Sequence, residues 1–137
     1  MEPYEYFEHT ADIGLRARGA DLAEAFANAG RGLAALIADP STVEPREQRE
    51  VSLPPAEPSE LLIAWLNELL YLLDAEGFLP SAITVDAVGA EGLAARLRGE
   101  RLDPARHEVK TGVKAATYHQ ARVECDGGCL VQAILDL

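Results

Sequence analysis

Apolar side chains are densest in the middle of the chain, where nine leucine, isoleucine and tryptophan residues fall between positions 61 and 73. The polar residues that interrupt or border this run are few: Asn67, Glu68 and Asp74. A helix with so narrow a polar stripe must be covered on most sides. Ser59 is a suitable N-cap, because its hydroxyl accepts a bond from an orphaned backbone N–H, and Gly77 is a suitable end. We therefore predict one helix from 59 to 77 at the centre of the core.

In the segment before this helix, apolar residues recur with two different spacings. Aromatic residues in 4–9 and the alternation of apolar and charged residues in 13–18 predict two strands. From Asp21 onward apolar residues recur at helical spacing, and Asp21 with Glu24 forms an acidic variant of the capping box. We predict a helix that begins at Asp21 and ends near position 39.

After the long helix the pattern has a period of two, which is typical of strands. Two of these strands are separated by a glycine-containing turn at 88–92, and 103–107 is a loop or a single helical turn. A proline-rich, charged crossing precedes the long helix and contains one short strand. The strands predicted in this part of the chain cover 49–53, 82–88, 93–102, 113–125 and 130–137.

The alternation from 113 to 125 is the longest in the sequence, and it separates two residues of interest. His119 falls on the apolar face together with Val123. We expect a hydrogen-bonded core histidine there rather than a ligand, because buried polar groups usually have structural partners. Lys114 and Ala116 fall on the opposite face, where a lysine ammonium group stays in water.

A length of 137 residues fits one domain, which can bury enough surface to fold without disulfides or a structural metal. The hydrophobic content of 48% and charged content of 26% exclude wholesale disorder. The central apolar run is broken by polar residues well short of the ~18 continuous apolar residues expected of a membrane span, so that alternative is weaker. The first ten residues are acidic and aromatic and do not resemble a targeting signal, so we expect a cytoplasmic protein.

The net charge of −11 opposes tight sequence-independent binding to nucleic acid, because such binding depends on lysine and arginine displacing counterions. Any connection to RNA is therefore expected to be indirect. Half of the twelve basic residues nevertheless fall between 96 and 114: Arg96, Arg98, Arg101, Arg106, Lys110 and Lys114. A solvated face and a docking surface for an acidic or phosphate-bearing partner explain this segment equally well.

The two cysteines, Cys125 and Cys129, flank a short Asp-Gly-Gly turn and are expected to face each other across a hairpin. A zinc site normally needs four ligands, so this pair alone is weak evidence for one. In a reducing cytoplasm we expect free thiols, with a metal or redox role as the weaker alternative.

Two polar places stand out as candidate sites. The stretch 9–12 is too polar for a core and too short for a linker. At the other end, Asp136 precedes Leu137, so a side-chain carboxylate and the terminal carboxylate repel each other unless a cation or donors lie between them. A frayed, solvated terminus is the simpler explanation on spacing alone.

Four stretches together resemble the archease family in order and spacing over essentially the whole chain: 9–14 (HTADIG), 65–72 (WLNELLYL), 113–119 (VKAATYH) and 134–137 (ILDL). The departures are small, with Glu8 where aspartate is expected and Ala116 where a larger aliphatic residue is usual. The resemblance implies an α+β fold over residues 1–137, a single-domain two-layer sandwich of mostly antiparallel strands packed on two main helices.

The same resemblance implies a function. The chain would be an accessory protein of an RtcB-type RNA ligase in tRNA splicing and RNA repair, promoting guanylylation and repeated turnover of the ligase without being an enzyme. The family's metal ligands carry over to Asp12, Asp136 and the terminal carboxylate of Leu137, and Lys114 is the other functional candidate. Hard carboxylate oxygens suit calcium better than zinc, with magnesium or manganese as alternatives.

Two other functions compete with this one. A chaperone-like modulator of an RNA methyltransferase would not need the metal. A stand-alone metallo-hydrolase could use carboxylates and a lysine to activate a metal-bound water. The hydrolase is the weaker alternative, because the sequence offers no general base separate from the expected ligands.

Overall fold

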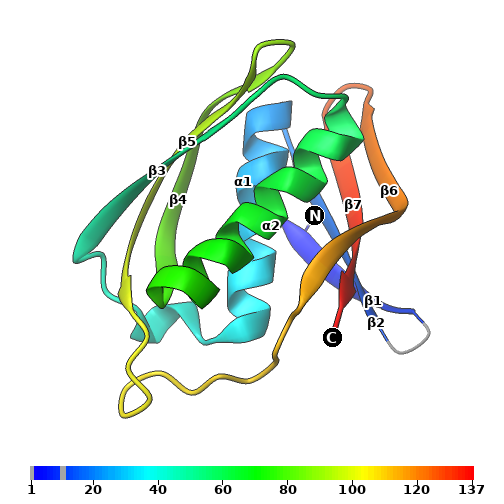
Figure 1. The fold of residues 1–137 in the computed structure, drawn as a ribbon. Coiled ribbons are helices and arrows are strands. Elements are labelled where there is room, and N and C mark those ends of the chain that lie inside the picture. Colours follow the sequence, from blue (N-terminus) through cyan, green and yellow to red (C-terminus); the bar gives the residue numbers. More distant parts are fainter. Residues whose placement is uncertain (1, 10–11) are drawn as a thin grey trace.

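The computed structural model describes residues 2–9 and 12–137, and in this part of the chain two helices accompany seven strands in two antiparallel sheets (Figure 1). One sheet has the order β1-β2-β7-β6 and the other β3-β5-β4. The elements are β1 (Tyr4–His9), β2 (Asp12–Gly19), α1 (Leu22–Ile37), the 3₁₀ turn η1 (Pro40–Thr42), β3 (Glu47–Leu53), α2 (Pro58–Glu76), β4 (Phe78–Gly89), β5 (Gly92–Arg101), β6 (Ala115–Cys125) and β7 (Cys129–Asp136).

Both helices lie between the two sheets (Figure 1). Helix α1 packs against β2 of one sheet and β4 of the other, and α2 packs mainly against β6. The inward faces meet in one hydrophobic cluster, in which Trp65, Phe26 and Leu97 are completely buried. The predicted α+β fold, with antiparallel strands on two main helices, is confirmed.

The central helix occurs almost where the apolar run predicts it, but its first turn differs. Helix α2 begins with Pro58 and is preceded by Glu57, whose side chain makes no capping bond, so the prediction of Ser59 as N-cap is wrong. Proline suits this first position because its fixed φ is helical and no intrahelical N–H bond is needed there. At the other end Gly77 has a φ of 66°, as a left-handed helix stop requires. Neither described helix combines the length and apolar character needed to cross a bilayer.

Helix α1 begins as its sequence predicts. The Asp21 carboxylate accepts a bond from the Glu24 backbone N–H at 2.8 Å, and the Glu24 carboxylate accepts from the Ala20 N–H at 2.8 Å. The first bond satisfies a donor that the helix itself leaves without a partner, and the second ties the residue before the N-cap to the first turn.

Strand β6 contains an irregularity that reverses its two faces. Five residue steps from Thr117 to Arg122 oppose only two steps along β7, so three extra residues are inserted. Because side chains alternate, an odd insertion moves the inward positions to the other parity. Ala116 is therefore buried before the bulge and Val123 packs on the core after it. His119 lies within the bulge and is exposed, so the prediction of a core histidine is wrong.

The two cysteines face each other across the β6–β7 hairpin, as expected from their spacing. They are joined by a disulfide, so the expectation of free thiols is wrong. Their Cα atoms are 4.1 Å apart because Cys125 and Cys129 are direct partners in the register. That proximity suits a bond between the two sulfurs.

A second packed layer covers the face of the β1-β2-β7-β6 sheet that points away from the helices, called here the outer face. Phe7, Gly14 and Ile134 are neighbours in one cross-strand row. Ile134 is 1% exposed although it is outside the main core cluster. The Phe7 ring lies directly on Gly14, and the Arg16 guanidinium lies 4.5 Å from the centre of that ring. This sheet is therefore covered on both faces near its middle.

We expect Gly14→Ala to lower the free energy of unfolding by about 1–3 kcal/mol, the usual cost of overpacking. A Cβ atom at position 14 would lie 2.1 Å from the nearest Phe7 ring carbon, so the ring must move. Gly89→Ala is the control, because no atom lies within 4 Å of its added methyl group. Chemical denaturation of both variants tests this, and equal midpoints for the two would contradict it.

Candidate metal and partner site

The structure places the two polar ends of the chain on neighbouring strands. Asp12 of β2 and Asp136 of β7 are direct Cα partners, and Ala115 of β6 is the partner of Asp136 on its other side. The Lys114 backbone N–H donates to the Asp136 carbonyl oxygen at 2.8 Å. Residues 124 positions apart in the sequence thus meet at one end of the paired strands β2 and β7.

In β1, His9 is the Cα partner of Asp12. The predicted site stretch 9–12 is described in part only, because Thr10, Ala11 and the side chain of His9 lie outside the described residues.

Two acidic residues oppose each other at this end of the strands. Directly opposed residues of an antiparallel pair lie on the same face with Cβ atoms about 4.5–5.5 Å apart, and like charges there repel. Asp136 is exposed, while Asp12 and Leu137 are half-buried. Carboxylate oxygens are ligands that calcium and magnesium prefer. Lys114, next to them, is exposed, as predicted from its place on the polar face of the strand pattern.

Within the described ranges 2–9 and 12–137, no three histidine, cysteine, aspartate or glutamate side chains gather as a metal group. Asp12 and Asp136 are the two side chains of this region whose oxygens suit a hard cation such as calcium.

Asn67 is a residue of this region that sequence reasoning missed. Its side-chain amide donates to the Ala116 carbonyl at 3.1 Å, and its side-chain oxygen accepts from the Ala116 N–H at 2.8 Å. The backbone N–H and carbonyl groups of Ala116, in the edge strand β6, are thereby both satisfied by a side chain of α2. The only signal in the sequence was a lone amide in a very apolar helix. Asn67 holds the start of β6 two residues after Lys114.

Gln132 is a second missed residue, a polar side chain among apolar ones in the last strand that is only 4% exposed. Its side-chain oxygen accepts two bonds from Arg16, at 3.1 and 2.8 Å, and its amide donates to the Gln120 carbonyl at 3.0 Å. Gln120 has a φ of 57° within the β6 bulge. The bulge is thus held on the outer face by an amide that bridges β2 and β6.

The same layer extends to β1. Hydrogen bonds from Arg16, and then from Arg18, lower the pKa of the Glu5 carboxyl group. Glu5 is therefore kept ionised as the outer partner of both arginines.

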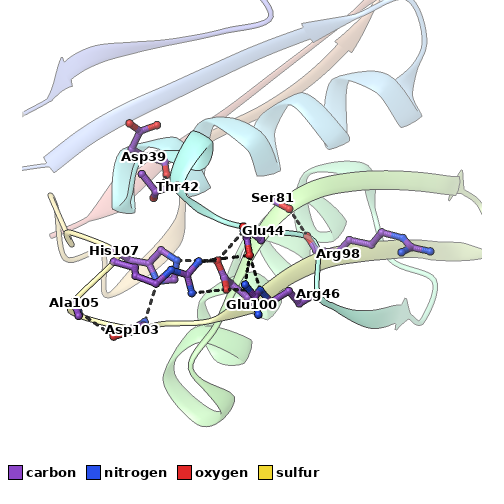
Figure 2. Close-up of polar contacts among 11 residues, drawn as sticks. Asp39, Thr42, Glu44, Arg46, Ser81, Arg98, Glu100, Asp103, Ala105 and His107 are labelled. Atoms are coloured by element: carbon purple, nitrogen blue, oxygen red, sulfur yellow. Dashed lines mark hydrogen bonds and ion pairs between the residues drawn. The ribbon is translucent and has the colours of Figure 1, made fainter.

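A buried polar cluster lies elsewhere, at the end of β5 (Figure 2). Glu100, 3% exposed, accepts two bonds from Arg106 at 2.9 and 2.6 Å and one from the Glu44 N–H at 2.7 Å. His107 Nδ1 accepts from the Asp103 N–H at 2.9 Å, so its Nε2–H donates to Glu100 at 3.0 Å. The cluster joins β5, the turn after it and the segment before β3, and its saturated bonds indicate a structural role.

This arrangement changes the interpretation of the basic segment 96–114. Arg106 is paired with Glu100, and Arg96 forms two bonds to Asp86 at 2.9 and 2.8 Å. The segment is therefore not a uniform positive surface.

Stability should fall at acid pH through Glu100. Bonds from Arg106, then from the Glu44 N–H, lower the pKa of Glu100 from 4.5 to about 2. A carboxyl group with a lowered folded-state pKa stabilises the fold above its unfolded pKa, and that contribution is lost between about pH 4.5 and 2. We expect the melting temperature of Glu100→Gln to depend less on pH over this range than that of the parent. Glu91→Gln, on the exposed β4–β5 turn, should follow the parent curve. Parallel curves for Glu100→Gln and the parent would refute this assignment.

Comparison with known proteins agrees with the fold. The model of the Archease protein family (MTH1598/TM1083) matches residues 4–137. Protein archease of Thermococcus gammatolerans is 42% identical over the full length of both chains, and that of Sulfurisphaera tokodaii is 42% identical over 93% of this chain and 92% of its own.

Two solved structures are also similar. Protein 1598 of Methanobacterium thermoautotrophicum has a TM-score of 0.81 and 33% identity over all of both chains. An archease from Thermotoga maritima, described as a possible chaperone, has a TM-score of 0.68 over all of this chain and 98% of its own; at 24% identity it shows the fold alone. The four sequence stretches, the two sheets around a helix pair and these full-length matches agree, and the chain belongs to the archease family.

Proposed function

We propose that the protein is an accessory factor that activates an RtcB-type RNA ligase in tRNA splicing and RNA repair. It would promote guanylylation and repeated turnover of the ligase and would not itself catalyse the joining of RNA. Family membership supports this proposal, and the meeting of Asp12, Asp136 and Lys114 at one end of the strands is the observation that carries it.

In this proposal Asp12, Asp136 and the Leu137 carboxylate hold a divalent cation, calcium in the first place, with magnesium or manganese as alternatives. The bound cation would neutralise the opposed carboxylates and present a charged tip to the ligase. The exposed Lys114 would contact nucleotide phosphates or an acidic group of the ligase. A net charge of −11 suits a protein that binds a basic, RNA-loaded partner in the cytoplasm and leaves the RNA to it.

The decisive experiment measures guanylylation of the cognate ligase with GTP and divalent metal, with and without this protein. We expect a faster and more complete transfer of the nucleotide when the protein is present at substoichiometric amounts. No stimulation at any ratio would exclude the proposal. If instead the protein improves the solubility of an RNA methyltransferase equally well without metal, the chaperone-like function is the correct one.

The missed residue Asn67 provides a further test. We expect Asn67→Ala to reduce stimulation of the ligase and to lower the free energy of unfolding by about 1–3 kcal/mol, because two bonds to Ala116 are lost. Hydrogen exchange at the Ala116 amide should accelerate, since Asn67 is its acceptor. Asn67→Asp keeps an acceptor and should retain that protection.

Glu68→Gln, a neighbouring polar change on the same helix, is the matched control for Asn67. It should leave both stimulation and exchange at Ala116 as in the parent. Unchanged exchange at Ala116 in Asn67→Ala would show that this residue does not hold the strand.

A further inference from the structure

The disulfide at the end of the β6–β7 hairpin is expected to contribute little to the stability of the fold. Cys125 and Cys129, the only cysteines of the sequence, are direct partners across the three residues 126–128. Gly127 and Gly128 both have positive φ, and the Asp126 N–H donates to the Gly128 carbonyl at 2.7 Å. A crosslink stabilises mainly by closing a long loop in the unfolded chain. This one closes a very short loop that the strand ladder already closes.

The disulfide is also accessible. Cys125 is exposed, and the half-buried Cys129 lines a pocket of about 630 Å³. The pocket lies between the hairpin, the end of β2 and the first turn of α1, with Gly19 and Leu130 in its wall. A cavity of this size admits a small organic molecule beside Cys129, one of the two bonded cysteines.

Charge around this pocket is strongly asymmetric. Four carboxylate side chains line it: Glu2, Glu24, Glu124 and Asp126. Arg18 is the one basic residue in the lining, and it donates to Glu5 at 3.1 Å. Arg122, outside the lining, donates to Glu124 at 2.7 Å, so Glu2, Glu24 and Asp126 carry the excess negative charge. An anion approaching the disulfide therefore meets net repulsion, and a cation meets net attraction.

We propose that Cys125–Cys129 is a thiol–disulfide exchange site that reacts with small cationic or neutral thiols in preference to anionic ones. The thiolate of the small molecule attacks one cysteine sulfur and forms a mixed disulfide, while the S–S bond breaks and the other sulfur leaves as a thiolate that takes up a proton. A second small thiol attacks the mixed disulfide and releases the second cysteine. Both cysteines are reduced and two small thiols are oxidised to their disulfide. The ladder keeps the hairpin folded throughout.

The test uses the intact folded protein and three probes: cysteamine, 2-mercaptoethanol and mercaptoacetate. Their thiolate forms carry net charges of about 0, −1 and −2. The rate with each thiolate is divided by its rate with a small neutral disulfide, 2-hydroxyethyl disulfide, because thiolates of higher pKa are intrinsically more nucleophilic. At about 0.01 M ionic strength these relative rates should fall in that order, on the order of tenfold overall, and they should converge near 1 M salt. Alkylation of the freed cysteines followed by mass spectrometry measures the rates.

Two variants sharpen this test. The double variant Glu124→Gln, Asp126→Asn should compress the spread of rates. Glu108→Gln removes an exposed carboxylate from the segment that follows β5, at the opposite end of the molecule from the hairpin in Figure 1, and should not change the spread. Equal relative rates for all three thiols at low salt would overturn the proposal.

The far-ultraviolet circular dichroism of the reduced protein must also match that of the oxidised protein. A reduced protein that unfolds would show that the disulfide is a structural staple, and would overturn the proposal as well. Because the readouts are thiol content and fold, the result does not depend on ligase stimulation.

Discussion

Trp65→Ala is expected to lower the free energy of unfolding by about 3–5 kcal/mol, the usual cost of emptying a large aromatic position in a packed core. Trp65 is completely buried in α2, and its indole N–H donates to the Phe26 carbonyl of α1 at 2.9 Å. The substitution removes both a large buried ring and the hydrogen bond from α2 to α1. Urea denaturation followed by circular dichroism measures the effect.

Tyr71→Ala is the matched control, because Tyr71 lies on the same helix and is 60% exposed. Its free energy of unfolding should stay within about 0.5 kcal/mol of the parent. Ligase stimulation by Trp65→Ala should decline only as far as the protein unfolds. An unchanged denaturation curve for Trp65→Ala would refute the assignment of this residue to the core.

Asp12→Ala and Asp136→Ala are expected to abolish ligase stimulation while the fold remains intact. The two carboxylates oppose each other across β2 and β7, so without metal each substitution removes a repulsion and leaves the melting temperature unchanged or raised. Added calcium should raise the melting temperature of the parent only, because a ligand of the folded state stabilises that state.

Asp74→Ala removes an exposed aspartate from α2 and serves as control for net charge. It should retain both stimulation and the response to calcium. Calorimetry that finds equal calcium binding by Asp136→Ala and the parent would place the metal elsewhere.

Local patterns predicted most of the fold. The capping pair Asp21 and Glu24 and the stop at Gly77 were identified because their partners lie within one turn of the chain. The long helix and the β4–β5 hairpin were recognised for the same reason. The wrong prediction at the start of α2 also concerns local sequence. Pro58 and Ser59 both suit the beginning of a helix, and Pro58 is the first helical residue.

Features that depend on distant partners could not be predicted in this way. The face of His119 is set by a bulge that only the β7 register reveals. Gln132 was overlooked because the alternation of apolar residues identifies the face of a strand that points to the core. It does not show that the other face is covered as well. The pairing of Asp12 with Asp136 was anticipated through the family resemblance alone, and metal binding at that pair stays a prediction.

The strand order has a consequence for how the chain reaches this structure. Strand β7 is the last strand in the sequence, yet it lies between β2 and β6 in the interior of its sheet. During synthesis the edge of β2 must wait for a partner that emerges more than a hundred residues later, from Cys129 onward. Contacts of such long range slow folding, and an edge left open in the meantime invites pairing with other chains. A nascent chain that lacks β7 is therefore the form of this protein most exposed to aggregation, and arrival of the last strand completes the sheet and the Asp12–Asp136 pair in the same step.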